Sequence, residues 1–239
     1  LVGSEMCIRD SAVIVTSSRV GAHYLAHIER LRVPVVLINT HSAHTGPYTF
    51  SVNVDNRHGG YTATTHLAGL GHARIAYVTG PVDHSDDRER LAGYRDALAP
   101  GGLVFDPALV VPGTGRAGGG ERALPRLLAA DRPPTAVFCY NDLTAIGLIR
   151  AAHHAGLAVP DDLAVVGFDD IPFASYVEPP LTTVAQPTRE MGRQAMKMAL
   201  ALIDREDHQL ASFSNIVLQG TLIVRESSGA TQRLAQELN

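Results

Sequence analysis

The sequence has few cysteines, no long apolar segment and no excess of basic residues. Its two cysteines, Cys7 and Cys139, exclude a disulfide framework and permit a reducing compartment. No apolar run approaches the roughly 20 residues of a membrane span, so we expect no membrane association. The formal net charge is −4. The chain is therefore a poor candidate for binding nucleic acid by itself, because neutralising phosphates requires a basic face. The 239 residues, 45% of them hydrophobic, are therefore expected to form a compact protein of one or two domains.

Motifs for catalysis and for cofactors are also scarce. The only lysine is Lys197 and no P-loop occurs. The segment Gly113–Gly118 matches G-x-G-x-x-G, but it comes late in the chain and no acidic ribose ligand follows it, so we favour a flexible glycine loop. His23 and His27 have a metal-ligand spacing without an evident third ligand. We expect no cofactor, no metal and no catalytic residue, which favours a binding protein over an enzyme.

The first eleven residues differ from the rest of the chain. They have no amphipathic period and none of the features of a signal peptide. The segment resembles a translated sequencing adapter, and a natural N-terminal tail is the alternative. We therefore leave residues 1–11 out of the fold prediction.

From residue 12 onward, short apolar runs alternate with helical patterns. The helices expected at 57–70 and 142–155 are each followed by a glycine, as helix ends commonly are. This alternation predicts an α/β protein with parallel strands covered on both faces. The predicted strands are Val13–Val15, Val35–Ile38, Ser51–Val54, Ile75–Val78, Ala136–Cys139 and Val165–Phe168.

Polar residues follow three of these strands directly. They are Thr79–Pro81, Tyr140–Asp142 and the pair Asp169 and Asp170, which are expected to face opposite sides. Ligands of doubly wound sheets bind beyond the carboxyl ends of the strands, so three clusters at one edge favour a binding site. Each cluster alone is equally typical of a turn or a helix cap.

An ordered set of motifs resembles the effector-binding domain of the LacI/GalR family of transcriptional regulators. The resemblance covers the chain from about residue 12 to 228, and the most specific motif is Val165–Ile171. The other motifs, in chain order, are Val54–Gly60, His66–Ala76, Arg88–Tyr94, Pro133–Asp142, Pro179–Val184, Gln186–Pro187, Met191–Gly192 and Leu222–Ser227.

This resemblance implies a periplasmic-binding-protein-like fold, with two Rossmann-like parallel-sheet subdomains joined by a three-segment hinge and a ligand in the cleft between them. The N-terminal subdomain would comprise 12–71 and 187–210 and lack its first strands, so that Val13–Val15 becomes a sheet edge. The C-terminal subdomain would comprise 72–184 and 214–228, followed by a tail at 229–239. The three crossings are expected near Leu70–Arg74, Val184–Pro187 and Ala211–Asn215.

The resemblance also implies ligand contacts. Its effector-contacting positions are Arg90, Asn141, Asp169, Gln186 and His58. For Asp55, Asn56 and Asp142 we favour helix capping. Many sugar-responsive relatives stack an aromatic ring on the ligand from the loop that is Gly113–Gly120 here, and this loop has none.

The function implied is effector sensing for a cytoplasmic DNA-binding regulator, usually a repressor. The partners implied are a small-molecule effector such as a carbohydrate, a second copy in a homodimer, and operator DNA bound only through an N-terminal helix-turn-helix that has no counterpart here. A solute-binding protein of sugar uptake is the alternative, and a nucleotide-dependent α/β enzyme is a third, which depends on the glycine loop alone.

Overall fold

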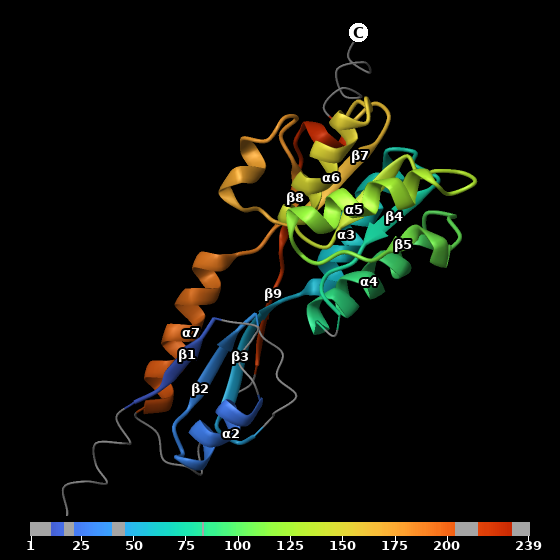
Figure 1. Cartoon of the computed structure of the whole chain (residues 1–239). Helices are drawn as coiled ribbons and strands as arrows, with labels where there is room; N and C mark the ends of the chain where they lie inside the picture. Colours follow the sequence, from blue (N-terminus) through green and yellow to red (C-terminus); the bar gives the residue numbers. More distant parts are fainter. Residues whose placement is uncertain (1–10, 17–21, 40–45, 83, 204–214, 231–239) are drawn as a thin grey trace, which may run out of the picture. The chain divides into compact units, whose positions relative to one another are not determined.

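The computed structural model describes residues 11–16, 22–39, 46–82, 84–203 and 215–230 (Figure 1). Contacts between Cα atoms divide the chain into two units. Unit 1 comprises Leu1–Asp55 and Pro187–Gln219, and unit 2 comprises Asn56–Gln186 and Gly220–Asn239. The chain therefore passes between the units three times. The expectations for residues 1–10, for most of the tail after 229 and for most of the crossing at Ala211–Asn215 lie outside the described residues.

Unit 1 is built on a parallel sheet of four strands. Their order is β1 (Val13–Val15), β2 (Val35–Ile38), β3 (Thr49–Val54) and β9 (Ile216–Leu218). β1 pairs with β2 alone among the described strands, and its three residues are only half-buried. This agrees with the expected edge position of Val13–Val15.

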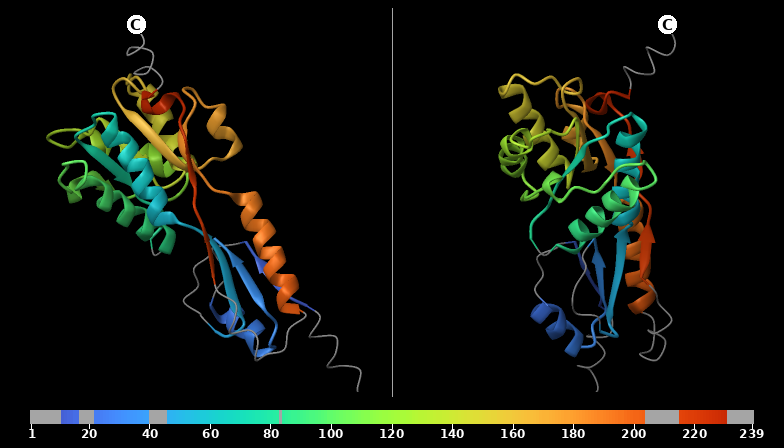
Figure 2. Two further views of the ribbon diagram at one scale, coloured as in Figure 1. Left: turned by 180° about the vertical axis from the view of Figure 1, so that it is seen from behind. Right: turned by 90° about the vertical axis from the view of Figure 1, so that its right-hand side faces the viewer.

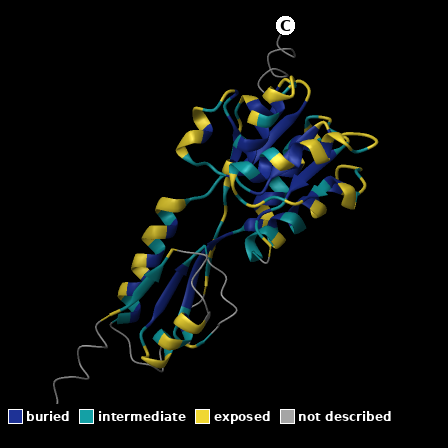
Figure 3. Ribbon diagram, in the orientation of Figure 1, coloured by how far each residue is buried: buried dark blue, intermediate teal, exposed yellow. Residues whose placement is uncertain are grey.

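Two helices cover the sheet of unit 1 on opposite faces (Figure 2). α2 (Ala22–Arg30) packs Leu25 against Val35 and Leu37, which share one face of β2. α7 (Thr188–Ile203) buries Met191, Ala195, Met198 and Leu202 at the predicted spacing of three to four residues and leaves its outer side exposed (Figure 3).

Unit 2 contains a sheet of six strands. The order is β10 (Thr221–Ile223), β8 (Thr182–Ala185), β7 (Ala164–Asp169), β6 (Ala136–Cys139), β4 (Ile75–Val78) and β5 (Val110–Val111). All neighbours are parallel except β10, which runs antiparallel to β8. β4 and β6 are buried throughout, as expected for strands covered on both faces.

The two faces of this sheet carry different helix pairs. α5 (Ala117–Leu128) and α6 (Asp142–His154) cover the face formed by Val78, Val137 and Val165. α3 (Asn56–Gly69) and α4 (Ser85–Leu98) cover the other, where Tyr94 stacks on Tyr77 and donates a 2.8 Å hydrogen bond to the carbonyl of Ile75. Three short 3-10 turns, Pro107–Leu109, Pro172–Ser175 and Glu226–Ser228, complete the described elements.

α3 and α4 approach closely because glycines line their contact. A Cβ atom at Gly93 would overlap the carbonyl oxygen of Arg57, and one at Gly60 would overlap that of Arg90. Any larger residue at either position would force the two helices apart. This contact holds the start of α3 beside the middle of α4.

The predicted architecture is confirmed in its alternation of strands and helices and in two parallel-sheet units linked by three crossings. The division between the units differs at two places. Residues 215–219 were expected in the C-terminal subdomain, but β9 pairs with β3, so this segment belongs to unit 1 and the chain returns to unit 2 at Gly220. Residues 56–71 were expected in the N-terminal subdomain, but α3 packs on α4 and the six-stranded sheet, so the chain enters unit 2 at Asn56. None of the helices formed by the described residues is both long enough and apolar enough to span a membrane.

Candidate functional site

The carboxyl ends of the parallel strands of unit 2 meet at one edge of its sheet, and polar residues follow several of them. Tyr140 follows β6, Asp169 ends β7 and Gln186 follows β8. The N-terminal turn of α4 brings Asp86 to the same edge, where its Oδ2 accepts a 2.6 Å hydrogen bond from the Tyr140 hydroxyl. The predicted gathering of polar clusters at one edge is therefore observed.

Arg90 of α4 is the centre of this group. Its side chain is only 3% exposed, and its Cζ lies 3.6 Å from the centroid of the Phe168 ring and 4.7 Å from that of Tyr140. Nε donates to Asn56 Oδ1 at 2.9 Å, and Nη1 donates to the carbonyl oxygen of Tyr140. A guanidinium with five fixed donors suits such a position, because stacking and hydrogen bonding hold its plane in one orientation.

Two carboxylates share the remaining nitrogen of Arg90. Its Nη2 lies 3.8 Å from Asp169 Oδ1 and 3.9 Å from Asp86 Oδ2. The carboxylates are about a quarter exposed, at 27% and 25%, whereas Arg90 is buried. A molecule that approaches from solvent therefore meets hydrogen-bond acceptors first, with the cation behind them.

Asp169 and Asp170 are adjacent but have different partners, as expected. Asp169 Oδ1 accepts a 2.6 Å hydrogen bond from Gln186 Nε2, while Asp170 accepts a 2.7 Å hydrogen bond from Arg225 Nη2. Both residues have positive φ angles, 119° and 57°, which L-residues other than glycine rarely adopt. This turn directs one carboxylate toward Arg90 and the other toward Arg225.

Asp142 forms a hydrogen bond that holds the same turn in place. Its Oδ2 accepts a 2.8 Å hydrogen bond from the backbone N–H of Ile171, and its Oδ1 accepts one of 2.6 Å from the Thr183 hydroxyl. The side chain is fully buried, and this burial raises its pKa to about 7. We expected Asp142 to cap α6, but Asn141 is the N-cap, and Asp142 instead joins α6 to the turn and to β8.

Electrostatics at the edge reflects burial opposed by specific partners. Burial raises the pKa of Asp169, and the Arg90 cation and the Gln186 hydrogen bond oppose that rise. Burial likewise raises the pKa of Asp87, whose Oδ1 accepts hydrogen bonds from Gly80 N and the Tyr77 hydroxyl. The cluster thus combines one buried cation with several acceptors, which suits a neutral ligand that carries hydrogen-bond donors.

The structure groups the predicted ligand-contacting residues unequally. Arg90, Asp169 and Gln186 lie together. Asn141 caps α6 by accepting from Thr144 N at 3.0 Å, and its Nδ2 donates to the Gly115 carbonyl. His58 lies on the exposed side of α3, with its Nε2 3.4 Å from Thr62 Oγ1. A ligand role for Asn141 and His58 stays a prediction.

Four members of the cluster were not among the predicted ligand-contacting residues. Asn56 was expected to be a cap, and in the structure its Oδ1 accepts from Arg90. Asp86 stands four residues before Arg90 on one helix, a spacing that places two side chains on the same face and could have revealed it. Tyr140 and Phe168 join the cluster through the stacking of their rings on Arg90, which no local pattern indicates.

The first part of the glycine-rich segment, residues 113–116, forms a loop, and the part from Ala117 onward is the start of α5. A Cβ atom at Gly113 would overlap the Thr79 carbonyl, and one at Gly120 would overlap that of Thr144 on α6. These glycines permit close packing of α5 against α6 and of the preceding segment against β4. In the part of the chain that the structure describes, no three His, Cys, Asp or Glu side chains gather as metal ligands.

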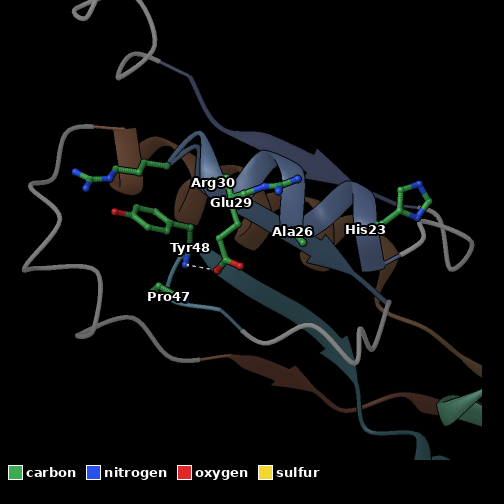
Figure 4. A pocket seen from close by; sticks show the side chains of 7 residues that line it. His23, Ala26, Glu29, Arg30, Pro47 and Tyr48 are labelled. Atoms are coloured by element: carbon green, nitrogen blue, oxygen red, sulfur yellow. Dashed lines mark hydrogen bonds between the residues drawn. The ribbon is translucent and has the colours of Figure 1, made fainter.

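A separate hollow of about 550 Å³ lies in unit 1 (Figure 4). α2 and the start of β3 form it, and Glu29 Oε1 accepts a 3.2 Å hydrogen bond from the backbone N–H of Tyr48 across it. Ala26, Arg30 and Pro47 also line it. It lacks the concentration of mutually bonded polar groups that marks the edge of unit 2.

Comparison with protein families identifies the class of this fold. The model of the periplasmic binding protein-like domain matches residues 64–228, which is more than half of the chain. The chain belongs to this family.

Curated relatives narrow the class further. The chain is 32% identical over 222 residues to the HTH-type transcriptional repressor PurR of Aliivibrio fischeri, covering 92% of this chain and 64% of that repressor. It is 38% identical over 180 residues to the HTH-type transcriptional repressor CytR of Escherichia coli K12, covering 75% of this chain and 52% of that repressor. The chain thus spans between about half and two thirds of these relatives.

Solved structures agree with this placement. The transcriptional regulator CelR in complex with cellobiose superposes with a TM-score of 0.80 at 33% identity, covering 91% of this chain and 65% of CelR. A LacI family regulator from Enterococcus faecium with bound ribose superposes with a TM-score of 0.79 at 29% identity, covering 91% of this chain and 79% of that one. The predicted LacI/GalR effector-binding domain with a periplasmic-binding-protein-like fold is therefore confirmed.

Proposed function

We propose that this chain is the effector-sensing domain of a LacI-type transcriptional regulator, and that it binds a small neutral polyhydroxylated molecule such as a sugar. The observation that carries this proposal is the edge cluster of unit 2, in which Arg90 holds Asp86 and Asp169 in place. Its role is binding, because the curated relatives are transcriptional repressors.

The chemistry of the cluster favours ligand hydroxyl groups. A hydroxyl can donate to the carboxylates of Asp169 or Asp86 while Arg90 keeps both in position. Asp86 and Asp169 together outweigh the single charge of Arg90, which disfavours anionic ligands such as sugar phosphates. Gln186, Asn141 and His58 are proposed as further contacts of the same ligand.

The rest of the regulator's action is part of the same proposal. The bound ligand would favour one conformation of the domain, which changes the relation of two subunits in a homodimer and thereby the affinity for operator DNA. The DNA would be bound in the cytoplasm by a helix-turn-helix preceding this domain. A solute-binding protein of sugar uptake is less well supported, since the curated relatives above are repressors.

A thermal-shift screen followed by calorimetric titration tests this proposal. The panel would contain ribose, cellobiose, other sugars, sugar phosphates and nucleosides. We expect a neutral sugar or nucleoside to raise the Tm, and this shift to disappear in the double variant Arg90→Ala, Asp169→Ala. The control is Arg74→Ala, Asp106→Ala, which removes a 3.2 Å ion pair that lies before β4 at the other edge of the same sheet. A shift that survives in the first double variant contradicts the site.

A further inference from the structure

Two residues of the edge cluster stand where the chain passes between the units. Asn56 is the residue at which the chain enters unit 2 for the first time, and Gln186 is the residue at which it leaves again. Both carry amide side chains, and each hydrogen-bonds one member of the pair Arg90 and Asp169. The pair is thus connected to two of the three crossings.

Asn56 determines how the Arg90 guanidinium is oriented. The Asn56 side chain is 1% exposed, and its Oδ1 accepts from Arg90 Nε at 2.9 Å. With Nη1 bonded to the Tyr140 carbonyl and the plane stacked on Phe168, this bond leaves Nη2 directed at Asp86 and Asp169. Without it, the guanidinium gains freedom to turn away from both carboxylates.

Gln186 holds Asp169 through both its backbone and its side chain. Its backbone N–H donates to the Asp169 carbonyl at 3.4 Å, and its Nε2 donates to Asp169 Oδ1 at 2.6 Å. Asp169 has the unusual φ of 119°, so its backbone conformation depends on such neighbours. A change in backbone direction after Gln186 therefore alters the carboxylate that faces Arg90.

We propose that Asn56 and Gln186 are positioning residues that couple the Arg90–Asp169 pair to the two crossings at which they stand. A ligand that binds to the pair changes the hydrogen bonds that hold these crossings. By reciprocity, a rearrangement at the crossings changes the free energy of ligand binding at the pair by the same amount. The coupling between these residues exists in the protein without ligand. Its role in the response to a ligand rests on the function proposed above.

The test measures the pKa of Asp169 while Asn56, which does not hydrogen-bond to it, is changed. Asp169 is influenced by Arg90, Asp86, Gln186, Asp142 and Tyr140. In the full chain without ligand, carboxyl NMR titration of Asn56→Leu should show the pKa of Asp169 raised by roughly half a unit or more, because Arg90 is no longer held beside it. Asn56→Gln, which keeps a neutral amide acceptor for Nε, should restore most of the original value.

Two further variants complete the test. In an Arg90→Met background, Asn56→Leu should leave the pKa of Asp169 unchanged, because the route through Arg90 is gone. Asp96→Asn, which removes the exposed partner of the neighbouring Arg57, should leave the pKa of Asp169 unchanged in every background. If Asn56→Leu does not fold, Asn56→Ser supplies the same comparison.

An equal pKa of Asp169 in the wild type and in the Asn56→Leu or Asn56→Ser variant would overturn the coupling, as would an equal shift with and without Arg90. The ligand arm is separate and uses ribose and cellobiose as probes. If neither binds, the function proposed above loses support while the titration still decides the coupling. If one binds, Asn56→Leu should weaken its binding about tenfold or more and Asn56→Gln by less than about threefold.

Discussion

The two units share an α/β architecture but use it differently. Among the described residues, the sheet of unit 1 has four short strands, of which β1 at the edge is half-buried, and two covering helices. The sheet of unit 2 has six strands, and β4 and β6 are buried along their whole length between two helix pairs. Its carboxyl edge carries a buried guanidinium with its aromatic and carboxylate partners. The charged network of the described residues is therefore concentrated where the packing is tightest.

This difference has a physical basis. A guanidinium is costly to bury unless its donors are bonded and its charge is compensated, and only closely packed elements supply such partners in fixed positions. In unit 2 the contact between α3 and α4, and the turn after β7, provide them. The ion pair Arg193–Glu190 of α7 in unit 1 is exposed and lies within one helix.

The largest effect is expected from filling the contact between α3 and α4. Gly93→Ala would place a Cβ against the Arg57 carbonyl and should lower the free energy of unfolding by about 1–3 kcal/mol or more. Gly192→Ala on α7 of unit 1 is the matched control. Its Cβ would meet nothing within 4 Å, so it should raise stability by about 1 kcal/mol. Chemical denaturation measures both, and equal effects would remove the packing difference between the units.

A pH-dependent effect is expected from Asp142. Its folded pKa of about 7 lies above its ordinary value of 3.8, so the unfolded state releases this proton first. Its contribution to stability is therefore complete below about pH 4 and is lost as the pH rises toward 7. Asp142→Asn should remove this dependence. In denaturation curves, the free energy of unfolding of the variant should therefore rise relative to that of the wild type between pH 4 and 7.

The sign of that effect can be checked against Asp96. The Arg57 guanidinium lowers the pKa of Asp96, so its contribution is present above the ordinary pKa and is lost as the pH falls through the folded value. The free energy of unfolding of Asp96→Asn should therefore fall relative to that of the wild type as the pH rises through this range. The same trend for both variants would contradict the assignment of Asp142.

The smallest effect is expected from the exposed ion pair of unit 1. Arg193→Ala removes the partner of Glu190 on the outer side of α7, and solvent screens such pairs. We expect no measurable change in Tm and no change in the affinity of any ligand found in the screen. A loss comparable to that of Arg90→Ala would mean that both units carry charged networks of similar importance.

Much of the fold was predictable because it depends on local pattern. Four of the six predicted strands, such as Ile75–Val78 and Ala136–Cys139, have the bounds observed, and the remaining two differ by one or two residues. β5, β8, β9 and β10 were not among the six predicted strands. In β9 and β10, three residues with partly exposed side chains carry no clear period. The place where the chain enters unit 2 was also missed, because the packing of α3 on α4 depends on glycines of two separate segments.

The candidate site was predictable in part for the same reason. The sequence by itself determined that Asp169 follows a strand at the carboxyl edge of a parallel sheet, and the family motifs singled out Arg90 and Gln186. Only the tertiary structure decided that Phe168 and Asn56 orient Arg90 and that Asn141 rather than Asp142 caps α6. Strand and helix periods are properties of neighbouring residues, whereas the partners of a buried charge come from segments far apart in the chain.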